Sequence, residues 1–299
     1  MNRGIASLLL ILVIQCALVL VTHWPAQDAS RARLEPMAPL APNEVDEIYV
    51  GDEFDNETAL RRVGERWFLP ELENLPANAQ MVDALLAAIT SAAKNWPVAD
   101  SVAARQRFRV ASYHYRRRIR LLGDGEVLGT FLLGTSPGFR KVYARNESQN
   151  AVYSITFSAH DAPGNSGPWL DRKLLQIRAP LGITADSYSL RRDGEKWHSG
   201  TGGVPDEREL QALLATLRNL QIDGLASEDD QRDLAEAEAD LVLNVESLAG
   251  EATLELFHRE DRHYIHSSEY PLFFTLGAWD YDRLTGIDFR LISGEVVAK

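Results

Sequence analysis

The sequence predicts an α+β protein: an N-terminal transmembrane helix followed by a duplicated, mainly antiparallel β-sheet domain with one amphipathic helix per repeat. Three observations support this prediction. They are a long uncharged stretch near the N-terminus, a pair of matching motifs 130 residues apart, and a regular alternation of apolar residues between turns. The 299 residues leave room for both repeats, and a hydrophobic content of 45% is enough to build packed cores.

An uncharged stretch runs from Gly4 to Val21, directly after Arg3. As a helix, a stretch of this length spans about 27 Å, close to the roughly 30 Å hydrocarbon core of a bilayer. We therefore predict a transmembrane anchor over residues 1–24. A cleavable signal peptide is the alternative, but its apolar region is usually shorter and is followed by a cleavage site between small residues.

The basic residues around this stretch predict its orientation. Arg3 precedes the span, whereas Arg31 and Arg33 follow it only after about ten residues. The positive-inside rule then places the N-terminus in the cytoplasm and the C-terminal domain in the periplasm of a bacterial inner membrane. The single cysteine, Cys16, falls within the span, so the exported part must be held together by its core rather than by disulfide bonds.

A stretch rich in proline and alanine follows the anchor. Residues 25–43 lack hydrophobic periodicity and are expected to form a semi-extended linker. Beyond it we predict two repeats, residues 44–170 and residues 183–299. The repeats are expected to form two similar lobes joined over residues 171–182.

Matching motifs indicate the duplication. LRRVGERW at residues 60–67 returns as LRRDGEKW at residues 190–197, and ALLA at residues 84–87 returns at residues 212–215. Weaker matches pair Gly125-Glu126 with Gly250-Glu251, and FRKVYA at residues 139–144 with DRHYIH at residues 261–266. The offsets fall steadily from 130 to 122 along the chain, as small deletions in one copy would produce.

Each repeat is expected to contain a hairpin, a helix and a four-stranded meander. The hairpins are predicted to turn at Val63-Gly64 and Asp193-Gly194. Apolar residues at positions i, i+3, i+4 and i+7 predict helices over residues 81–93 and 207–220. The expected meander strands are residues 118–122, 127–133, 141–145 and 151–157, then 239–245, 252–258, 263–266 and 272–276, with a last strand near 287–292.

Charge excludes one class of partner and leaves another open. With 31 basic and 43 acidic residues the net charge is −12, which argues against binding to nucleic acid. Residues 101–123 nevertheless hold seven arginines and no acid, whereas residues 223–240 hold eight acids and one arginine. Two solvated faces are the simplest interpretation. Attraction between the repeats and binding of an anionic partner are the alternatives.

The stretch GTSPG, residues 134–138, has the G-x-S-x-G spacing of a serine-hydrolase elbow. Pro137 has no N–H to offer an oxyanion hole, and the residues that follow alternate like a strand rather than a helix. We therefore expect a strand-to-strand turn at Ser136, and no enzymatic activity.

Two further clusters could suggest chemistry. His258, His263 and His266 have an H-x4-H-x2-H spacing, but strand residues three apart point to opposite faces, so we expect surface histidines rather than a metal site. Asp280 and Asp282 are expected on the solvated face of a strand. No motif predicts a metal or a cofactor.

Three stretches together resemble the bacterial family of the domain of unknown function 4340: residues 67–69, 84–89 and 133–144. The resemblance extends over most of residues 1–290 and implies a membrane-anchored protein with no known activity, cofactor or catalytic residue. Members often resemble neighbours of ABC-2-type exporters and gliding-type auxiliary subunits. The resemblance therefore implies an accessory role on the extracytoplasmic side of a transporter.

The expected function is a non-catalytic extracytoplasmic interaction domain, accessory to an ABC-type export system. The alternative is a binding module for an anionic glycan or lipid, and a serine hydrolase at Ser136 is the third choice. The candidate interaction surface combines cations with aromatic rings: Arg116, Arg117, Arg118, Phe139, Arg140, Lys141 and Tyr143.

Overall fold

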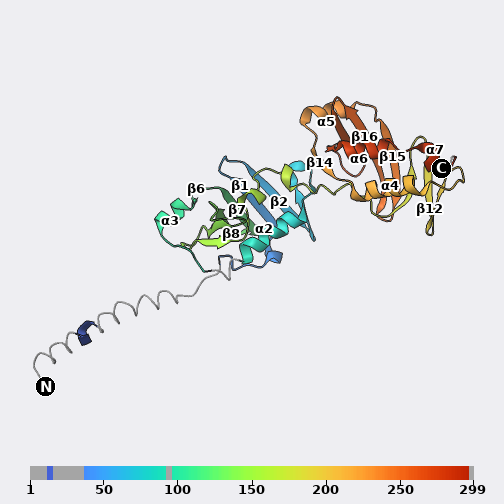
Figure 1. Cartoon of the computed structure of the whole chain (residues 1–299). Coiled ribbons are helices and arrows are strands. Elements are labelled where there is room, and N and C mark those ends of the chain that lie inside the picture. Colours follow the sequence, from blue (N-terminus) through green and yellow to red (C-terminus); the bar gives the residue numbers. More distant parts are fainter. Residues whose placement is uncertain (1–11, 16–36, 92–95, 296–299) are drawn as a thin grey trace, which may run out of the picture.

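The computed structural model describes residues 12–15, 37–91 and 96–295. They form two lobes, each built on an eight-stranded sheet in which every pair of neighbouring strands is antiparallel (Figure 1). We call residues 37–168 the first lobe, residues 169–178 the junction segment and residues 179–295 the second lobe. The predicted α+β class is confirmed, and two separate sheets fit a duplicated domain.

The sheet of the first lobe has the strand order β10-β9-β8-β7-β1-β2-β3-β4. Its strands are β1 (Glu47–Asp52), β2 (Glu57–Val63), β3 (Arg66–Leu69), β4 (Leu75–Pro76), β7 (Arg117–Gly123), β8 (Glu126–Leu133), β9 (Val142–Asn146) and β10 (Tyr153–Ile155). The other elements are α2 (Ala79–Ser91), α3 (Val102–Arg107), β5 (Val110–Ala111), β6 (His114–Tyr115) and the 3-10 helices Pro42–Glu44, Pro70–Leu72, Ala159–Asp161 and Gly167–Trp169.

The sheet of the second lobe has the strand order β13-β12-β11-β15-β16-β17-β18-β14. Its strands are β11 (Pro180–Thr184), β12 (Ser189–Asp193), β13 (Lys196–Ser199), β14 (Ile222–Leu225), β15 (Leu241–Ser247), β16 (Gly250–Arg259), β17 (Arg262–Ser267) and β18 (Phe273–Leu276). Its helices are α4 (Glu207–Asn219), α5 (Glu228–Ala235), α6 (Ala278–Thr285) and α7 (Phe289–Ile292).

One helix in each lobe packs its apolar stripe against the sheet. In α2 the periodic residues Val82, Leu85, Leu86 and Ile89 are all buried, and so are Leu210, Leu213, Leu214 and Leu217 in α4. Both helices begin at a side-chain cap: Asn78 accepts hydrogen bonds from the first N–H groups of α2, and Asp206 does so for α4. The two predicted helices are confirmed, each 13 residues long.

The opposite face of each sheet is partly covered as well. Phe131 and Leu133 of β8 join the main core, while Leu132 between them packs with Val110 and Val152 on the other face. In the second lobe α5 covers the matching region, because Leu234 packs on Phe257 and Tyr264. In this half of each sheet, alternate residues of a strand therefore pack into cores on opposite faces of the sheet.

Both sheets follow the same path. A three-stranded meander is followed by a helix, and then by a four-stranded meander whose first strand pairs with the first strand of the sheet. The hairpins even share their register: Arg62 lies opposite Trp67, and Arg192 opposite Trp197. Gly64 and Gly194 have positive φ, as a two-residue hairpin turn requires, and each turn lies one residue later than predicted.

The sequence match between Gly125 and Gly250 is one residue out of register with the structural match between the two turns. Gly125 lies inside the β7–β8 turn, whereas Gly250 is already the first residue of β16. The residues that close the two turns are Gly123 with Glu126, and Ser247 with Gly250. Equivalent turn residues are therefore 124 apart rather than 125.

The predictions for the C-terminal region were wrong. Residues 287–292 were expected as a strand, but they form α7, which begins at Asp288, whose side chain accepts hydrogen bonds from Arg290 N and Leu291 N. Asp280 and Asp282 were expected on a strand, but they lie on helix α6. Burial, with a contribution from Asp223, raises the pKa of Asp280, so this carboxyl group is not fully solvated either.

Most of the N-terminal prediction falls outside the described residues. Only residues 12–15 of the predicted span are described, as part of a helix, and the linker is described from residue 37 onward. Within the part of the chain that the structure describes, no helix has the length and hydropathy needed to cross a bilayer.

Candidate functional site

The structure does not bring the predicted interaction surface together. Arg117 lies on the α2 side of the sheet, where its Nε donates a hydrogen bond of 2.6 Å to the carbonyl of Ala162. Strand alternation puts Arg116 and Arg118 on the other face, and Arg118 forms an ion pair of 3.6 Å with Glu147. The three adjacent arginines therefore do not form one cationic patch.

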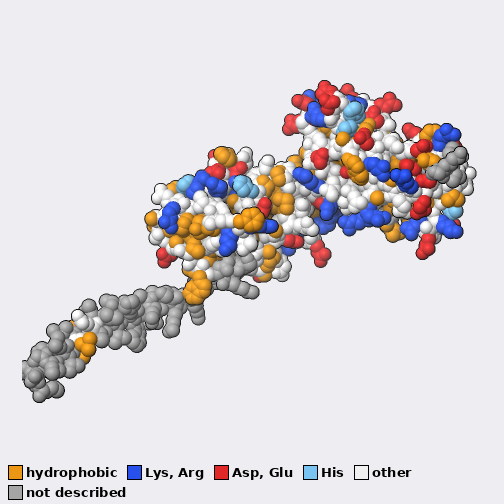
Figure 2. All heavy atoms as spheres, in the orientation of Figure 1, with side chains coloured by type: hydrophobic (Ala, Val, Ile, Leu, Met, Phe, Trp, Pro, Cys, Tyr) orange, Lys and Arg blue, Asp and Glu red, His pale blue; other side chains and the backbone are white. Residues whose placement is uncertain are grey.

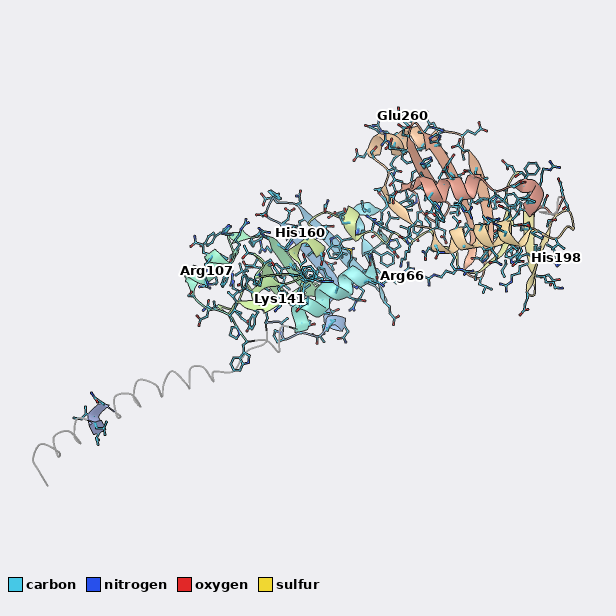
Figure 3. The ribbon with its side chains drawn as sticks, viewed as in Figure 1. Arg66, Arg107, Lys141, His160, His198 and Glu260 are labelled. Carbon is cyan, nitrogen blue, oxygen red and sulfur yellow. The ribbon has the colours of Figure 1, made fainter. Side chains whose placement is uncertain are left out.

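The four remaining candidate residues also separate. The ring of Tyr143 stacks on Phe108 at 4.0 Å, so its face is already occupied. Phe139 is 93% exposed at the β8–β9 connection, next in sequence to the exposed residues Arg140 and Lys141. Figure 3 labels Lys141 in this connection. Only these three stay together.

The two charged runs find partners within their own lobes. In the arginine-rich run Arg109 pairs with Glu53, and Arg120 with Glu57 at 2.7 Å. The acidic run behaves likewise, since Asp230 pairs with Arg262. Among the described residues no ion pair connects the lobes, so the structure does not show the attraction between repeats that the sequence suggested as one alternative.

One arginine of the first lobe is structural. Arg145 is 3% exposed, and its Nε donates to the carbonyl of Val110 at 2.6 Å while Nη1 donates to the carbonyls of Glu147 and Gln149. Burial, and then the charge of Arg105, lowers the pKa of this guanidinium. Arg145 thus fixes strand β5 against β9.

Ser136 lies in a turn that joins strand β8 to strand β9, as predicted. Its hydroxyl donates to the carbonyl of Gly138 at 2.6 Å and accepts a bond from Gly138 N at 3.2 Å. The serine hydroxyl therefore stabilises its own turn, a familiar use of serine in connections.

The histidines divide between the two faces of the second sheet, as predicted. His258 and His263 lie opposite each other on β16 and β17 and stack at 4.8 Å, with Tyr281 of α6 beside them. Burial, assisted by a hydrogen bond to Asp240, raises the pKa of Tyr281 to about 12. His266 faces the other way and contacts Glu255 at 2.8 Å. The described residues include no cluster able to hold a metal ion.

A groove lies where the two lobes meet, around the start of α2. One cavity of about 320 Å³ is lined by the beginning of α2, by Gln221 and by the junction segment, which contributes Asp171 and three cations, Arg172, Lys173 and Arg178. A second cavity of about 360 Å³ is lined by α2, Arg140 and Phe157. Both cavities share Asn78 and Gln80, and we call the two together the junction groove.

The backbone of the junction segment is bonded to both lobes. Trp169, fully buried, donates its indole N–H to the carbonyl of Pro163 at 2.9 Å. The segment's backbone bonds are Asn78 N to Trp169 O at 2.7 Å, Asp171 N to Pro76 O at 2.9 Å, Ile177 N to Leu217 O at 3.0 Å and Ile222 N to Arg172 O at 3.0 Å. These bonds fix the backbone that carries the three cations of the groove.

The cations of the groove have no ionic partners. Arg172, Lys173 and Arg178 are exposed, and none of them forms an ion pair with any residue that the structure describes. The neighbouring Asp171 uses one carboxylate oxygen to accept a bond from Lys173 N. In Figure 2, Lys and Arg side chains gather along the lower edge of the second lobe, beginning where it meets the first lobe.

A side-chain contact across the junction supports the same arrangement. Arg66 lies next to the turn of the β2–β3 hairpin, on the side of the first lobe that faces the second (Figure 3), and its side chain hydrogen bonds to Tyr270 of the second lobe. Burial, and then Glu269, raises the pKa of Tyr270, while Arg66 opposes that shift. The two lobes therefore meet through side chains as well as through the junction segment.

A family model for the domain of unknown function DUF4340 matches residues 67–241, more than half of the chain. The chain belongs to the DUF4340 family. The matched region runs from β3 to the beginning of β15 and includes α2, the junction segment and α4. No curated protein and no solved structure matches the chain.

Sequence reasoning missed the groove of this DUF4340 protein. Its cations lie in the stretch DRKLLQIR, residues 171–178, which was assigned only to the connection between the repeats. A local excess of three cations over one acid, in a chain of net charge −12, was the available signal. Arg140 is the one predicted residue that lines the groove.

Proposed function

We propose that this DUF4340 protein is a single-pass envelope protein whose two lobes form a non-catalytic interaction module, accessory to an ABC-type export system. The N-terminal stretch of residues 4–21 supplies the membrane anchor in this proposal, and the two lobes lie in the periplasm. The resemblance to neighbours of exporters supports the choice of partner.

The observation that carries the proposal is the composite groove between the lobes. Its walls come from α2 of the first lobe, from the junction segment, and from Gln221 of the second lobe. Binding sites occur preferentially at interfaces between domains, because neither domain alone encloses them. A fused duplication that holds exposed, unpaired cations at such an interface is suited to binding a partner.

The surroundings of the reactive side chains also favour binding over catalysis. The hydroxyl of Ser136 is bonded within its own turn, and Arg145 holds backbone carbonyl groups together. The stacked pair His258 and His263 packs against Tyr281, whose hydroxyl donates to Asp240 at 3.0 Å. In each case the group contributes to the fold.

The proposal is tested by crosslinking in intact cells, with a tag on the full-length chain, followed by gentle solubilisation and identification of crosslinked proteins. We expect permease subunits of an exporter to be recovered, and a reporter fused after Lys299 to be active only outside the cytoplasm. Recovery of the chain alone, or a reporter active inside the cell, would contradict the proposal.

The alternative ligand class, an anionic glycan or lipid, has one observation in its favour. Phe139, Arg140 and Lys141 form an exposed aromatic and cationic group in the β8–β9 connection of the first lobe. Substituting Arg140→Glu together with Lys141→Glu would then remove binding to phosphatidylglycerol vesicles. Vesicle binding that survives this double change excludes that site.

A further inference from the structure

We propose that the junction groove binds a linear acidic segment of a partner protein. Its carboxylates lie over Arg172, Lys173 and Arg178, and one of its apolar side chains enters the adjoining cavity beside Phe157. This inference rests on the proposed function, because that function requires a partner protein. It assigns a place and a chemistry to the contact.

Charge is the first argument. The chain holds 43 acidic residues against 31 basic ones, whereas the junction segment holds three cations and one acid. The three cations of the junction segment lie within seven residues of sequence, and none has an ionic partner among the described residues. An anionic ligand would supply the missing charge, and Arg residues favour carboxylates because they can bond both oxygens.

Rigidity is the second argument. The backbone on both sides of Arg172 is hydrogen bonded, to Pro76 in the first lobe and to Ile222 in the second. The backbone therefore has little conformational freedom left to lose when a ligand binds, and the cost of ordering the site falls on the three long side chains. The helix itself adds little, because Asn78 already accepts bonds from Gln80 N and Met81 N. The cations therefore supply the attraction.

The shape and walls of the groove favour a peptide. Asn78 and Gln80 line both cavities, so the cationic cavity and the partly apolar cavity are neighbours at the start of α2. Met81, Ala84 and Phe157 supply the apolar walls of this second cavity, which Arg140, Thr156 and Asp161 also line. A linear segment with acidic residues and one apolar anchor matches this order, as in other modes of peptide recognition.

Other anionic ligands fit the same walls less well. Stacking of a glycan requires an open aromatic face, but Phe157 is only 7% exposed. A lipid surface would be met by cations on a projecting face, whereas these line a cavity of about 320 Å³. The observations thus select the peptide.

The test uses the full-length chain in neutral detergent micelles and a fluorescein-labelled peptide in which a run of glutamates precedes Leu-Phe. Fluorescence anisotropy should show saturable binding that weakens as salt is added. The triple variant Arg172→Gln, Lys173→Gln, Arg178→Gln should weaken binding about tenfold, the effect expected for loss of three exposed ion pairs.

A matched control removes the same charge elsewhere. The control variant carries three substitutions on the exposed β12–β13 hairpin: Arg191→Gln, Arg192→Gln and Lys196→Gln. It should bind the peptide as well as wild type does. Circular dichroism should show both triple variants folded. Absence of saturable binding, or equal weakening in the two variants, overturns the inference. So does binding of phosphatidylglycerol vesicles or inorganic phosphate at the three cations without binding of the peptide.

Crosslinking in cells separates this inference from the proposed function. If wild type captures permease subunits and the junction variant captures them equally well, the groove inference fails while the proposed function stands. If wild type captures no partner, the proposed function fails, whatever the peptide result. Loss of capture in the junction variant, with capture kept in the hairpin variant, supports both.

Discussion

The two lobes share a strand order but extend their sheets at opposite edges. In the first lobe β4 lies beside β3, with Leu69 opposite Leu75. In the second lobe the extra strand β14 lies beside β18, with Ile222 opposite Leu276, and β13 is left as the edge strand. The common meanders were retained after duplication while the edges changed, because an edge strand is constrained by one neighbour only.

The outer faces of the two sheets, away from α2 and α4, differ in charge. In the first lobe Arg118 and Arg120 of β7 lie on the outer face, and Arg116 comes just before this strand. The matching region of the second lobe is a polar groove of about 420 Å³, lined by hydroxyl groups, by Asn244 and by Glu246. Residues that contact water rather than a core can change sign without disturbing the fold.

The largest expected difference between the lobes concerns their equivalent tryptophans. Trp67 is 4% exposed, and its carbonyl accepts a bond from Ala77 N beyond β4, whereas Trp197 on the edge strand is half-buried. We expect Trp67→Ala to lower the free energy of unfolding by about 3–5 kcal/mol, and Trp197→Ala by about 1–2 kcal/mol. Urea unfolding followed by far-UV circular dichroism measures both. Equal losses would show that β4 adds no stability to its edge.

A second difference lies at the start of the second strand of each lobe. Thr58 in the first lobe is buried, and its hydroxyl contacts Glu71 at 3.3 Å. Tyr188 holds the matching position in the second lobe, where its buried hydroxyl has no hydrogen-bond partner among the described residues. Burial raises the pKa of Tyr188 to about 12 from 10.0.

This raised pKa predicts a loss of stability in alkali. A raised pKa means that the folded state favours the neutral phenol, so its contribution is complete below pH 10 and is lost as the pH rises towards 12. The full effect is about 2–3 kcal/mol. Tyr188→Phe should remove this loss and leave stability near neutral pH unchanged or up to about 1 kcal/mol higher.

Urea midpoints at neutral pH and at about pH 11 check this prediction, since the unfolded phenol titrates near pH 10. Tyr281, with a pKa also raised to about 12, is present in both proteins and so cancels in the comparison. A Tyr188→Phe variant that loses as much stability in alkali as wild type would show that the phenol ionises freely in the folded state.

Helical periodicity and strand alternation predicted the common part of the two lobes. Leu85 and Leu213 each belong to a stripe long enough to define a period, and tertiary packing then agrees with it. The stretch of residues 287–292 is too short to show a helical or a strand period. It forms a helix whose N-terminus is capped by the side chain of Asp288. Contacts between the lobes determine the junction segment instead, since its backbone bonds reach Pro76 in one lobe and Leu217 in the other.

The candidate site could not be predicted for the same reason. Arg172 and Lys173 are visible in the sequence as a basic pair, but the cavity beside them exists only because two lobes pack around α2. Arg116 to Arg118 appeared continuous in sequence, yet strand alternation divides them between two faces. The sequence thus shows where charged residues cluster along the chain. Whether they share one surface depends on which face of a strand each side chain occupies and on how the lobes pack.

The smallest expected effect tests whether the outer faces are interchangeable. Arg120 lies between Tyr49 and Thr130 on the neighbouring strands, as Asn244 lies between Thr184 and Thr253 in the second lobe. The change Arg120→Asn gives the first lobe the residue of the second.

This change breaks the Arg120–Glu57 ion pair, whose side chains are 35% and 42% exposed. Exposed pairs contribute little, so we expect the free energy of unfolding to fall by less than about 1 kcal/mol. Urea unfolding in low and in high salt provides the measurement, because salt should shrink even this small difference. A loss above about 2 kcal/mol that salt does not change would mean that Arg120 packs on Tyr49, 4.7 Å away, as a fixed part of the fold. The outer face of the first sheet would then be constrained by packing, and its difference in charge from the second lobe would not be free variation.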